Sequence, residues 1–211
     1  MRPIAPVLLI AMAMPAVAAS EPNHCEIAVT GETTVRIAAE APRDGTHGKL
    51  AASTDYWLSD GQLRMALETM QSLGGKLSPT EKQRKVDEGM KKDPRFMVLL
   101  INCLSDEGGV IFSPTNGSKY AHVPMKAGSY AIVPSGRTRP GEFTAMFHLA
   151  TRGKRESYSV AEPGKLVVTR FDRKGITGTF SFKAEQRGKA GKKVDVNGSF
   201  SYACTGEACQ K

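Results

Sequence analysis

The side chains that could perform catalysis in this chain are few and scattered. The four histidines, His24, His47, His122 and His148, include no pair spaced to share one face of a helix. The sequence contains no G-x-S-x-G, S-x-x-K, H-E-x-x-H or phosphate-binding glycine pattern. His148 is a candidate general base, and a hydrogen-bonded strand histidine is the alternative. The sequence leans away from an enzyme, and a hydrolase with a site assembled from distant residues remains a further alternative.

The strongest charge feature is a run of four cations within residues 187–193. Arg187, Lys189, Lys192 and Lys193 share this stretch with two glycines and no acidic residue. Clustered cations attract anionic polymers, which makes the run a candidate ligand-binding site. The alternative is that these cations lie in solvent at the tip of a hairpin, where they keep the protein soluble and hinder a sheet edge from pairing with other chains. The run lacks interleaved aromatic side chains, so nucleic acid is not the expected partner.

The only tryptophan is the second candidate for ligand binding. Trp57 follows Tyr56, and together they make the one adjacent aromatic pair of the chain. Such a pair can stack on a sugar ring, but it can also anchor a loop against the core. We keep Trp57 as a candidate ligand-binding residue beside the basic run.

Four cysteines, Cys25, Cys103, Cys204 and Cys209, predict two disulfides in an oxidising compartment. Three pairings are possible. Cys204 and Cys209 bracket a short segment containing Gly206, which can turn back on itself, so a Cys204–Cys209 bond with Cys25 bonded to Cys103 is favoured. The spacing does not match a zinc site, and neither a metal nor a cofactor is expected.

Residues 1–19 have the pattern of a signal peptide. Arg2 precedes an uncharged apolar run over residues 4–17, and Ala16, Ala18 and Ala19 supply small residues for cleavage. The run is shorter than the roughly 20 residues that cross a bilayer. We therefore expect an exported protein, periplasmic or extracellular, with residues 20–211 as a single domain and no transmembrane span after cleavage.

The composition is that of an ordinary globular domain, with 40% hydrophobic and 24% charged residues. It excludes a disordered polyelectrolyte, a collagen-like repeat and a long coiled coil. The net charge of +8 is uneven, because residues 152–211 hold 13 basic and 6 acidic residues while residues 20–151 hold 15 of each. The basic character therefore belongs to the C-terminal part of the chain.

The first half of the mature chain predicts a hairpin, a loop and two helices. Alternating apolar residues indicate the hairpin over residues 25–38, and residues 39–57 read as a loop. Ser59 with Gln62, and Ser78 with Glu81, have the spacing of reciprocal helix caps and place helices within residues 59–92. The first helix is expected to bury Leu63, Ala66, Leu67, Met70 and Leu73.

After residue 94 the sequence predicts only strands and turns. Expected strands cover residues 96–104, 108–112, 120–123, 130–133, 142–150, 166–171, 176–185 and 194–202. The first of these is an almost continuous apolar run, which predicts a strand buried on both faces. Helices confined to one segment cannot connect parallel strands. We therefore predict a mainly β fold, an antiparallel β-sandwich or flattened barrel with a helical insertion at 59–92.

The last two strands carry a pattern that resembles a known group of proteins. Ile176, Gly178, Phe180, Phe182 and Ala184 form an I-x-G-x-F-x-F-x-A strand, and residues 198–200 form a G-x-F strand. This block of about 40 residues resembles the closing strands of uncharacterised secreted bacterial all-β domains. The resemblance implies an all-β envelope domain, and it carries no functional residue over to this chain.

Three classes of function follow from these observations. The leading interpretation is an exported non-catalytic binding protein, inhibitor-like or immunity-like toward another envelope protein. The first alternative is a module that binds an anionic envelope polymer through residues 187–193. The second alternative is the hydrolase named above.

Overall fold

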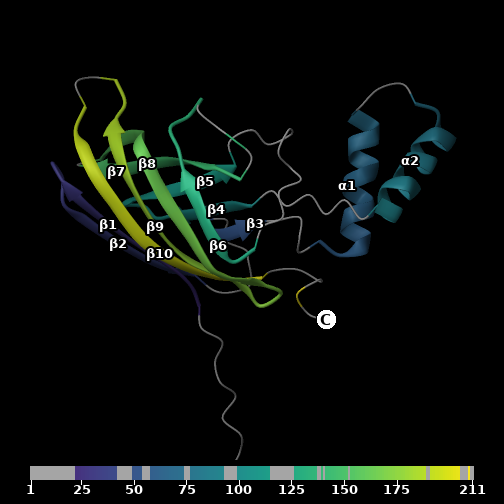
Figure 1. Ribbon diagram of the computed structural model, residues 1–211, viewed down its shortest axis with the longest axis horizontal. Helices are drawn as coiled ribbons and strands as arrows, with labels where there is room; N and C mark the ends of the chain where they lie inside the picture. Colours follow the sequence, from purple (N-terminus) through teal and green to yellow (C-terminus); the bar gives the residue numbers. More distant parts are fainter. Residues whose placement is uncertain are drawn as a thin grey trace, which may run out of the picture.

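The computed structural model describes residues 22–41, 49–53, 58–73, 77–92, 99–114, 126–136, 139, 141–151, 153–188, 191–204 and 209. Within them, ten strands form one sheet that curls into a nearly closed barrel, and two helices lie to one side of it (Figure 1). The strand order is β2-β1-β10-β9-β8-β6-β7-β5-β4-β3. The predicted mainly β fold with a two-helix segment is confirmed.

The strands are long near the C-terminus and short at the far edge of the sheet. They are β1 (Asn23–Gly31), β2 (Val35–Ala41), β3 (Leu50–Ser53), β4 (Leu100–Leu104), β5 (Gly108–Pro114), β6 (Gly128–Ile132), β7 (Phe143–Thr151), β8 (Lys154–Asp172), β9 (Gly175–Gln186) and β10 (Lys193–Ala203). Neighbours pair antiparallel except β6 and β7, which meet in parallel at Ile132 and Phe143. The sheet is therefore mixed, although almost every ladder follows the predicted antiparallel sense.

The longest strand, β8, connects two parts of the sheet. Its first half pairs with β7 and its second half with β6, while β9 runs along its other edge. The register with β9 shifts around Pro163 and Gly164. These shifts let one strand change partners without ending. The sequence predicted only residues 166–171 of this strand.

The interior of the barrel is filled by aromatic side chains. Phe180, Phe182, Phe200 and Tyr202 are all buried, as the alternation predicted, and none is more than 5% exposed. The two glycines of the motif explain how these rings fit. Gly198 faces Phe180 across the ladder and Gly178 faces Phe200. A Cβ at either glycine would overlap the opposing ring, so each glycine makes room for a phenylalanine on the neighbouring strand.

Bonds across the interior tie the two ends of the sheet together. The Cys25–Cys103 disulfide joins β1 to β4, and Cys204–Cys209 closes a short C-terminal loop, so the favoured pairing is confirmed. The Tyr202 hydroxyl donates to the Asn102 carbonyl at 2.8 Å. These links hold β4 against β1 and β10, which brings the barrel close to closure.

The helices α1 (Asp60–Leu73) and α2 (Pro79–Lys92) begin at the predicted caps. The Gln62 amide donates to the Ser59 hydroxyl at 3.2 Å, and the Ser59 amide donates to the Gln62 side chain at 2.9 Å. Leu63 and Leu67 pack on Val86 and Met90 in a cluster separate from the barrel core. Ala66, Met70 and Leu73 were expected to be buried but are exposed, because α2 covers only half of the apolar face of α1.

Two local predictions were wrong. Residues 39–57 are not all loop, since β2 extends to Ala41 and Leu50–Ser53 form β3. Of the strand expected at 96–104, the structure describes residues 99–104 and begins the strand at Leu100; its burial alternates, so one face and not both is buried. The signal peptide at 1–19, the strand at 120–123 and Trp57 lie outside the described residues. Among the described helices, none is long and apolar enough to cross a membrane.

Candidate functional site

The predicted basic run connects β9 to β10, as the sequence indicated. The Arg187 amide donates to the Ser157 carbonyl at 2.9 Å, and the Gln186 amide donates to the Lys192 carbonyl at 3.0 Å. Gly188 takes a φ of 109°, a conformation that favours glycine. The described part of this loop is therefore fastened along β8.

The cations of this loop differ in whether an acidic side chain lies close to them. Lys192 lies 3.6 Å from the Glu156 carboxylate, which also accepts a hydrogen bond from the Tyr158 hydroxyl at 3.0 Å. Arg187 and Lys193 are exposed, and neither makes an ion pair with a described acidic residue. Lys189 lies outside the described residues. The structure thus brings three of the four predicted cations to one end of the barrel and neutralises one of them in part.

The Glu156 contact also affects the neighbouring tyrosine. Burial, followed by the hydrogen bond to Glu156, raises the pKa of Tyr158 to about 12. The phenol is therefore a hydrogen-bond donor at neutral pH, and it fixes one oxygen of the carboxylate that Lys192 approaches. This arrangement positions Lys192 at the edge of the barrel.

Two further cations lie at the same end, and the sequence reading missed them. Lys154 and Arg155 begin β8 and are exposed. The β8 strand extends past the end of β9, where Tyr158 faces Gln186, so its first residues run beside the 187–193 loop. We call Lys154, Arg155, Arg187, Lys192 and Lys193 the basic end. The predicted length of β8 was too short to reveal that the β7–β8 turn reaches this loop.

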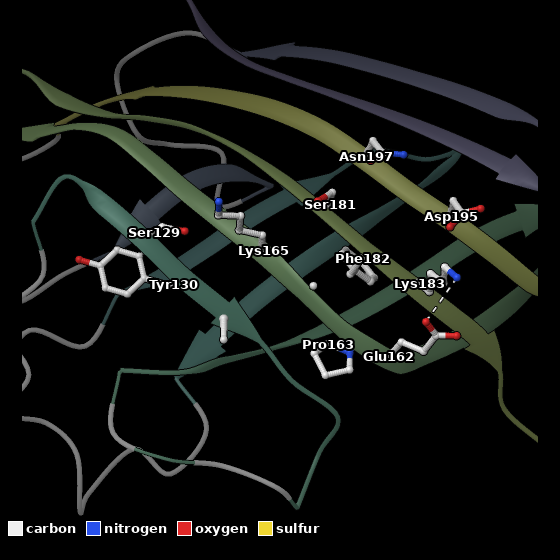
Figure 2. Close-up of a pocket in the computed structure, with 12 residues that line it drawn as sticks. Ser129, Tyr130, Glu162, Pro163, Lys165, Ser181, Phe182, Lys183, Asp195 and Asn197 are labelled. Atoms are coloured by element: carbon white, nitrogen blue, oxygen red, sulfur yellow. Dashed lines mark ion pairs between the residues drawn. The ribbon is translucent and has the colours of Figure 1, made fainter.

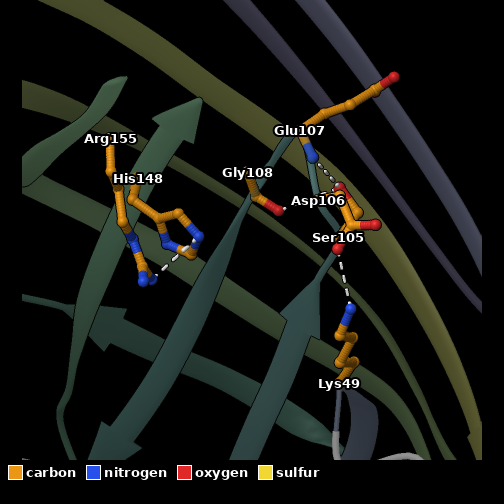
Figure 3. Close-up of polar contacts among 7 residues, drawn as sticks. All are labelled: Lys49, Ser105, Asp106, Glu107, Gly108, His148 and Arg155. Atoms are coloured by element: carbon orange, nitrogen blue, oxygen red, sulfur yellow. Dashed lines mark hydrogen bonds and ion pairs between the residues drawn. The ribbon is translucent and has the colours of Figure 1, made fainter. Parts of the chain in front are cut away.

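His148 lies next to the basic end and contacts Arg155 (Figure 3). The Arg155 Nη2 atom is 3.1 Å from His148 Nε2. A guanidinium can only donate, so Nε2 accepts and the ring proton sits on Nδ1. Burial, and next the charge of Arg155, lower the pKa of His148. The imidazole is neutral and its free lone pair is already engaged, so the arrangement favours the hydrogen-bonded strand histidine over a general base.

A second polar cluster closes the β4–β5 turn (Figure 3). Lys49 Nζ lies 2.9 Å from Asp106 Oδ1, and this contact lowers the pKa of the Asp106 carboxyl. The Ser105 hydroxyl donates to the Gly108 carbonyl at 3.1 Å and accepts from the Glu107 amide at 3.2 Å. These contacts are those of a turn that is held locally, and the exposed ion pair adds little stability.

The outer surface of the sheet also carries a groove, with a volume of about 570 Å³ (Figure 2). Four strands contribute to it, β6, β8, β9 and β10. Its lining is Ser129, Tyr130, Ala131, Glu162, Pro163, Gly164, Lys165, Ser181, Phe182, Lys183, Asp195 and Asn197. The groove lies where the register of β8 shifts, next to Gly164, which has no room for a Cβ against β9.

The chemistry of this groove is polar and mixed in charge. Lys183 pairs with Glu162 at 3.3 Å, which leaves Lys165 as an exposed cation beside them. Ser181 and Asn197 add uncharged donors and acceptors on the neighbouring strands. These groups can hold a polar surface or ligand by hydrogen bonds. The sequence reading missed the groove because its members come from four strands and lie as far apart as residues 129 and 197.

The described residues contain no group of three or more His, Cys, Asp or Glu arranged to hold a metal ion. Comparison of the chain with models of protein families, with curated proteins and with solved structures gave no match. The resemblance of the closing strands to secreted bacterial domains therefore stays a prediction. The candidate functional surfaces of this protein are the basic end and the outer groove.

Proposed function

We propose that the protein is an exported, non-catalytic binding protein that holds its partner on the outer surface of the barrel. The observation that supports this most is the filled interior, where Tyr158, Tyr202, Phe112, Phe143 and Phe147 are all fully buried. A barrel filled by its own side chains leaves recognition to its outer faces and loops. An inhibitor-like or immunity-like contact with another envelope protein fits such a surface.

Two features support export. The signal pattern at residues 1–19 is one, and the two disulfides are the other, because such bonds persist in oxidising compartments. We therefore place the protein in the periplasm or outside the cell. Intact-mass measurement of exported material tests this directly, with a mature chain beginning at Ala19 or Ser20 as the expected result.

The outer groove is the surface that we assign to a protein partner. It combines one exposed cation, one exposed acidic side chain, one ion pair and several uncharged polar groups over four strands, which suits the polar recognition of another protein surface. A pull-down from periplasmic extract tests this. We expect one stoichiometric partner with the parent chain, and its loss with the Ser181→Arg variant, which fills the groove.

Ser72→Arg is the matched control, because Ser72 is exposed on α1 and does not line the groove. It makes the same Ser-to-Arg change elsewhere on the protein surface and should retain the partner. Equal loss in both variants would mean that charge alone, and not the groove, governs capture.

A second candidate function has its own observation. The basic end gathers cations from the β7–β8 turn and from the 187–193 loop, which suits an anionic envelope polymer such as lipopolysaccharide phosphate. Replacing Arg187, Lys189, Lys192 and Lys193 by Ser should abolish retention on lipopolysaccharide or heparin at low salt. Such binding weakens steeply with salt, since the Debye length falls from about 10 Å at 0.1 M to about 3 Å at 1 M.

The control for the second candidate removes the same charge elsewhere. Lys126, Arg139, Lys165 and Lys174 are exposed cations outside the basic end, and their replacement by Ser should leave retention almost unchanged. If both quadruple variants lose retention equally, net charge alone explains the binding. If neither loses it, the polymer function should be dropped in favour of the protein partner.

A further inference from the structure

The two edge strands of the sheet are β2 and β3, and β2 is the longer of the two. Among the described residues, β2 is hydrogen-bonded to β1 alone, in a regular register from Asn23 opposite Ala41 to Val29 opposite Val35. Protected sheet edges usually carry a proline, a bulge or charged side chains, or are covered by another segment. The sequence of β2, Val-Arg-Ile-Ala-Ala-Glu-Ala, has no proline, and its ladder has no bulge. Its charged residues are Arg36 and Glu40, and residues 38–41 also border a cavity whose other wall is formed by Lys49, Leu50 and residues 104–106. The strand therefore has no proline or bulge that would block further pairing.

The backbone groups that face the open edge can be identified from the ladders. The Glu32 amide donates to the Lys193 carbonyl at 3.3 Å, in the same register that places Thr30 opposite Asp195. Bonding residues alternate along an antiparallel strand, so the even-numbered residues of β1 bond to β10 and the odd-numbered ones bond to β2.

The same alternation continues into β2. Its odd-numbered residues lie opposite odd-numbered residues of β1, as with Ile37 opposite Ile27, and they use their backbone groups on that side. Arg36, Ala38 and Glu40 consequently direct their N–H and C=O groups toward the open edge.

The side chains of these three residues share the outer face of the sheet. The Arg36 side chain is 77% exposed and that of Glu40 is 67% exposed, with the small Ala38 between them. Each charged side chain has one contact on β1: Arg36 Nη2 is 3.5 Å from Glu26, and Glu40 is 3.6 Å from His24. Such exposed pairs are weak and can be extended to a further partner at little cost.

This pattern is complementary to itself under a two-fold rotation. When two β2 strands pair antiparallel about Ala38, Arg36 of each copy lies opposite Glu40 of the other. In the same alignment, Ala38 of one copy lies opposite Ala38 of the other. The backbone N–H and C=O groups of Arg36, Ala38 and Glu40 all face the partner strand, so each of these residues exchanges two hydrogen bonds with the residue opposite it. If the pairing is centred one or two residues away from Ala38, Arg36 no longer lies opposite Glu40. A two-fold interface between identical chains requires a surface that complements itself in this way.

We propose that β2 is the dimerisation edge of this protein, and that its partner is a second copy of the same chain. The two sheets join across Ala38 into one continuous sheet, with an Arg36–Glu40 pair on each side of the two-fold axis. This proposal is independent of the groove and of the basic end, since neither includes a residue of β2.

Sedimentation velocity over a concentration series tests the proposal with the mature chain. The parent should form a dimer. Arg36→Glu and Glu40→Arg should each weaken it about tenfold or more, because each single change places two like-charged pairs opposite one another. The double variant R36E/E40R should recover the parent affinity. An equimolar mixture of the two single variants should form heterodimers, since the acidic edge of one then meets the basic edge of the other.

Two further variants separate pairing from folding. Ala38→Pro removes an outward N–H that β1 does not use, so it should abolish the dimer and leave the melting temperature nearly unchanged. Lys165→Glu reverses a charge on the outer face of β8 and should leave the dimer intact. A parent chain that sediments as a monomer at every concentration would overturn the proposal. So would a double variant R36E/E40R that stays as weak as the single ones.

Discussion

The barrel and the helix pair are stabilised in very different ways. The barrel buries a continuous cluster of apolar side chains and has a disulfide across its interior. The helix pair buries only Leu63, Leu67 and Val86, with Met90 at the margin. Its helices depend in addition on reciprocal caps at Ser59 and Ser78. The difference shows that local signals define the helices, whereas distant pairings define the barrel.

The helix pair also leaves apolar side chains uncovered. Met65 is 66% exposed and Leu73 is 83% exposed, whereas the large apolar residues of the barrel interior are almost all buried. Regions with few buried contacts open at lower free energy than a large core. We therefore expect the helix pair to exchange its amide hydrogens by local opening and the barrel strands only by global unfolding.

The largest expected effect concerns the aromatic interior. Phe182→Ala should reduce the free energy of unfolding of the barrel by about 3 to 5 kcal/mol, because a large buried ring is lost and a cavity remains. Ser181→Ala, on the exposed face of the same strand, should be nearly silent. Chemical denaturation followed by circular dichroism measures both. Equal effects at the two positions would contradict the alternation of β9.

The second effect concerns the disulfide across the barrel. Replacing Cys25 and Cys103 by Ser should cost about 2 to 5 kcal/mol. Cys25 and Cys103 are 78 residues apart, whereas Cys204 and Cys209 are 5 apart, and longer loops lose more chain entropy. The matched Cys204→Ser and Cys209→Ser double variant should therefore cost less, by roughly 2 kcal/mol. Thermal melts of both double variants provide the comparison, and a reversed order would show that strain or residual structure dominates.

The third prediction tests whether the helix pair is a separate unit. Leu67→Ala should destabilise it by about 2 kcal/mol, at the lower end for a leucine truncation, because few neighbours surround the site. Amide exchange by mass spectrometry should then quicken in Asp60–Leu73 and Pro79–Lys92 and stay unchanged in β9 and β10. Uniform acceleration over the whole chain would mean that the helices and the barrel unfold together.

The smallest effect is a dependence on pH at His148. Its pKa in the folded protein is lowered from the ordinary 6.5, first by burial and then by Arg155. Just below pH 6.5 the unfolded chain therefore binds a proton that the folded chain does not. The contribution of His148 to the free energy of unfolding is therefore fully present above pH 6.5 and decreases as the pH falls below 6.5.

Denaturation at several pH values checks this expectation, with His148→Gln as the variant that should lose this part of the pH dependence. Arg155→Ala should move the His148 pKa upward, which nuclear magnetic resonance titration of the ring measures. An unchanged His148 pKa in that variant would mean that burial alone causes the shift.

Segments with a clear period could be predicted from the sequence. The β1–β2 hairpin, both helix caps and the β9–β10 strands depend on neighbours within a few residues or on strict alternation, and all are present. The burial of α1 could not be predicted, because the pattern shows an apolar face but not how much of it α2 covers. The β8 strand was predicted too short, since Pro163 and Gly164 usually end a strand and here mark shifts in register.

The candidate surfaces divide in the same way. The 187–193 loop was visible because its cations are adjacent in the sequence, whereas Lys154 and Arg155 join it only through the pairing of β8 with β9. The outer groove was not visible, because side chains such as Ser129, Lys165 and Asn197 are brought together by the sheet alone. Sequence order carries no signal for such a site when each residue is an ordinary one for the outer face of a strand.

The neighbouring first and last strands have a consequence for the order of folding. β1 pairs with β10, and the Ala203 amide donates to the Asn23 side chain over a sequence separation of 180 residues. During synthesis, β1 can form its hairpin with β2 early, but its other edge stays open until the end of the chain is made. Folds dominated by such distant pairings form slowly. The interval before β10 arrives is therefore the time when the growing chain most needs protection from pairing with other chains.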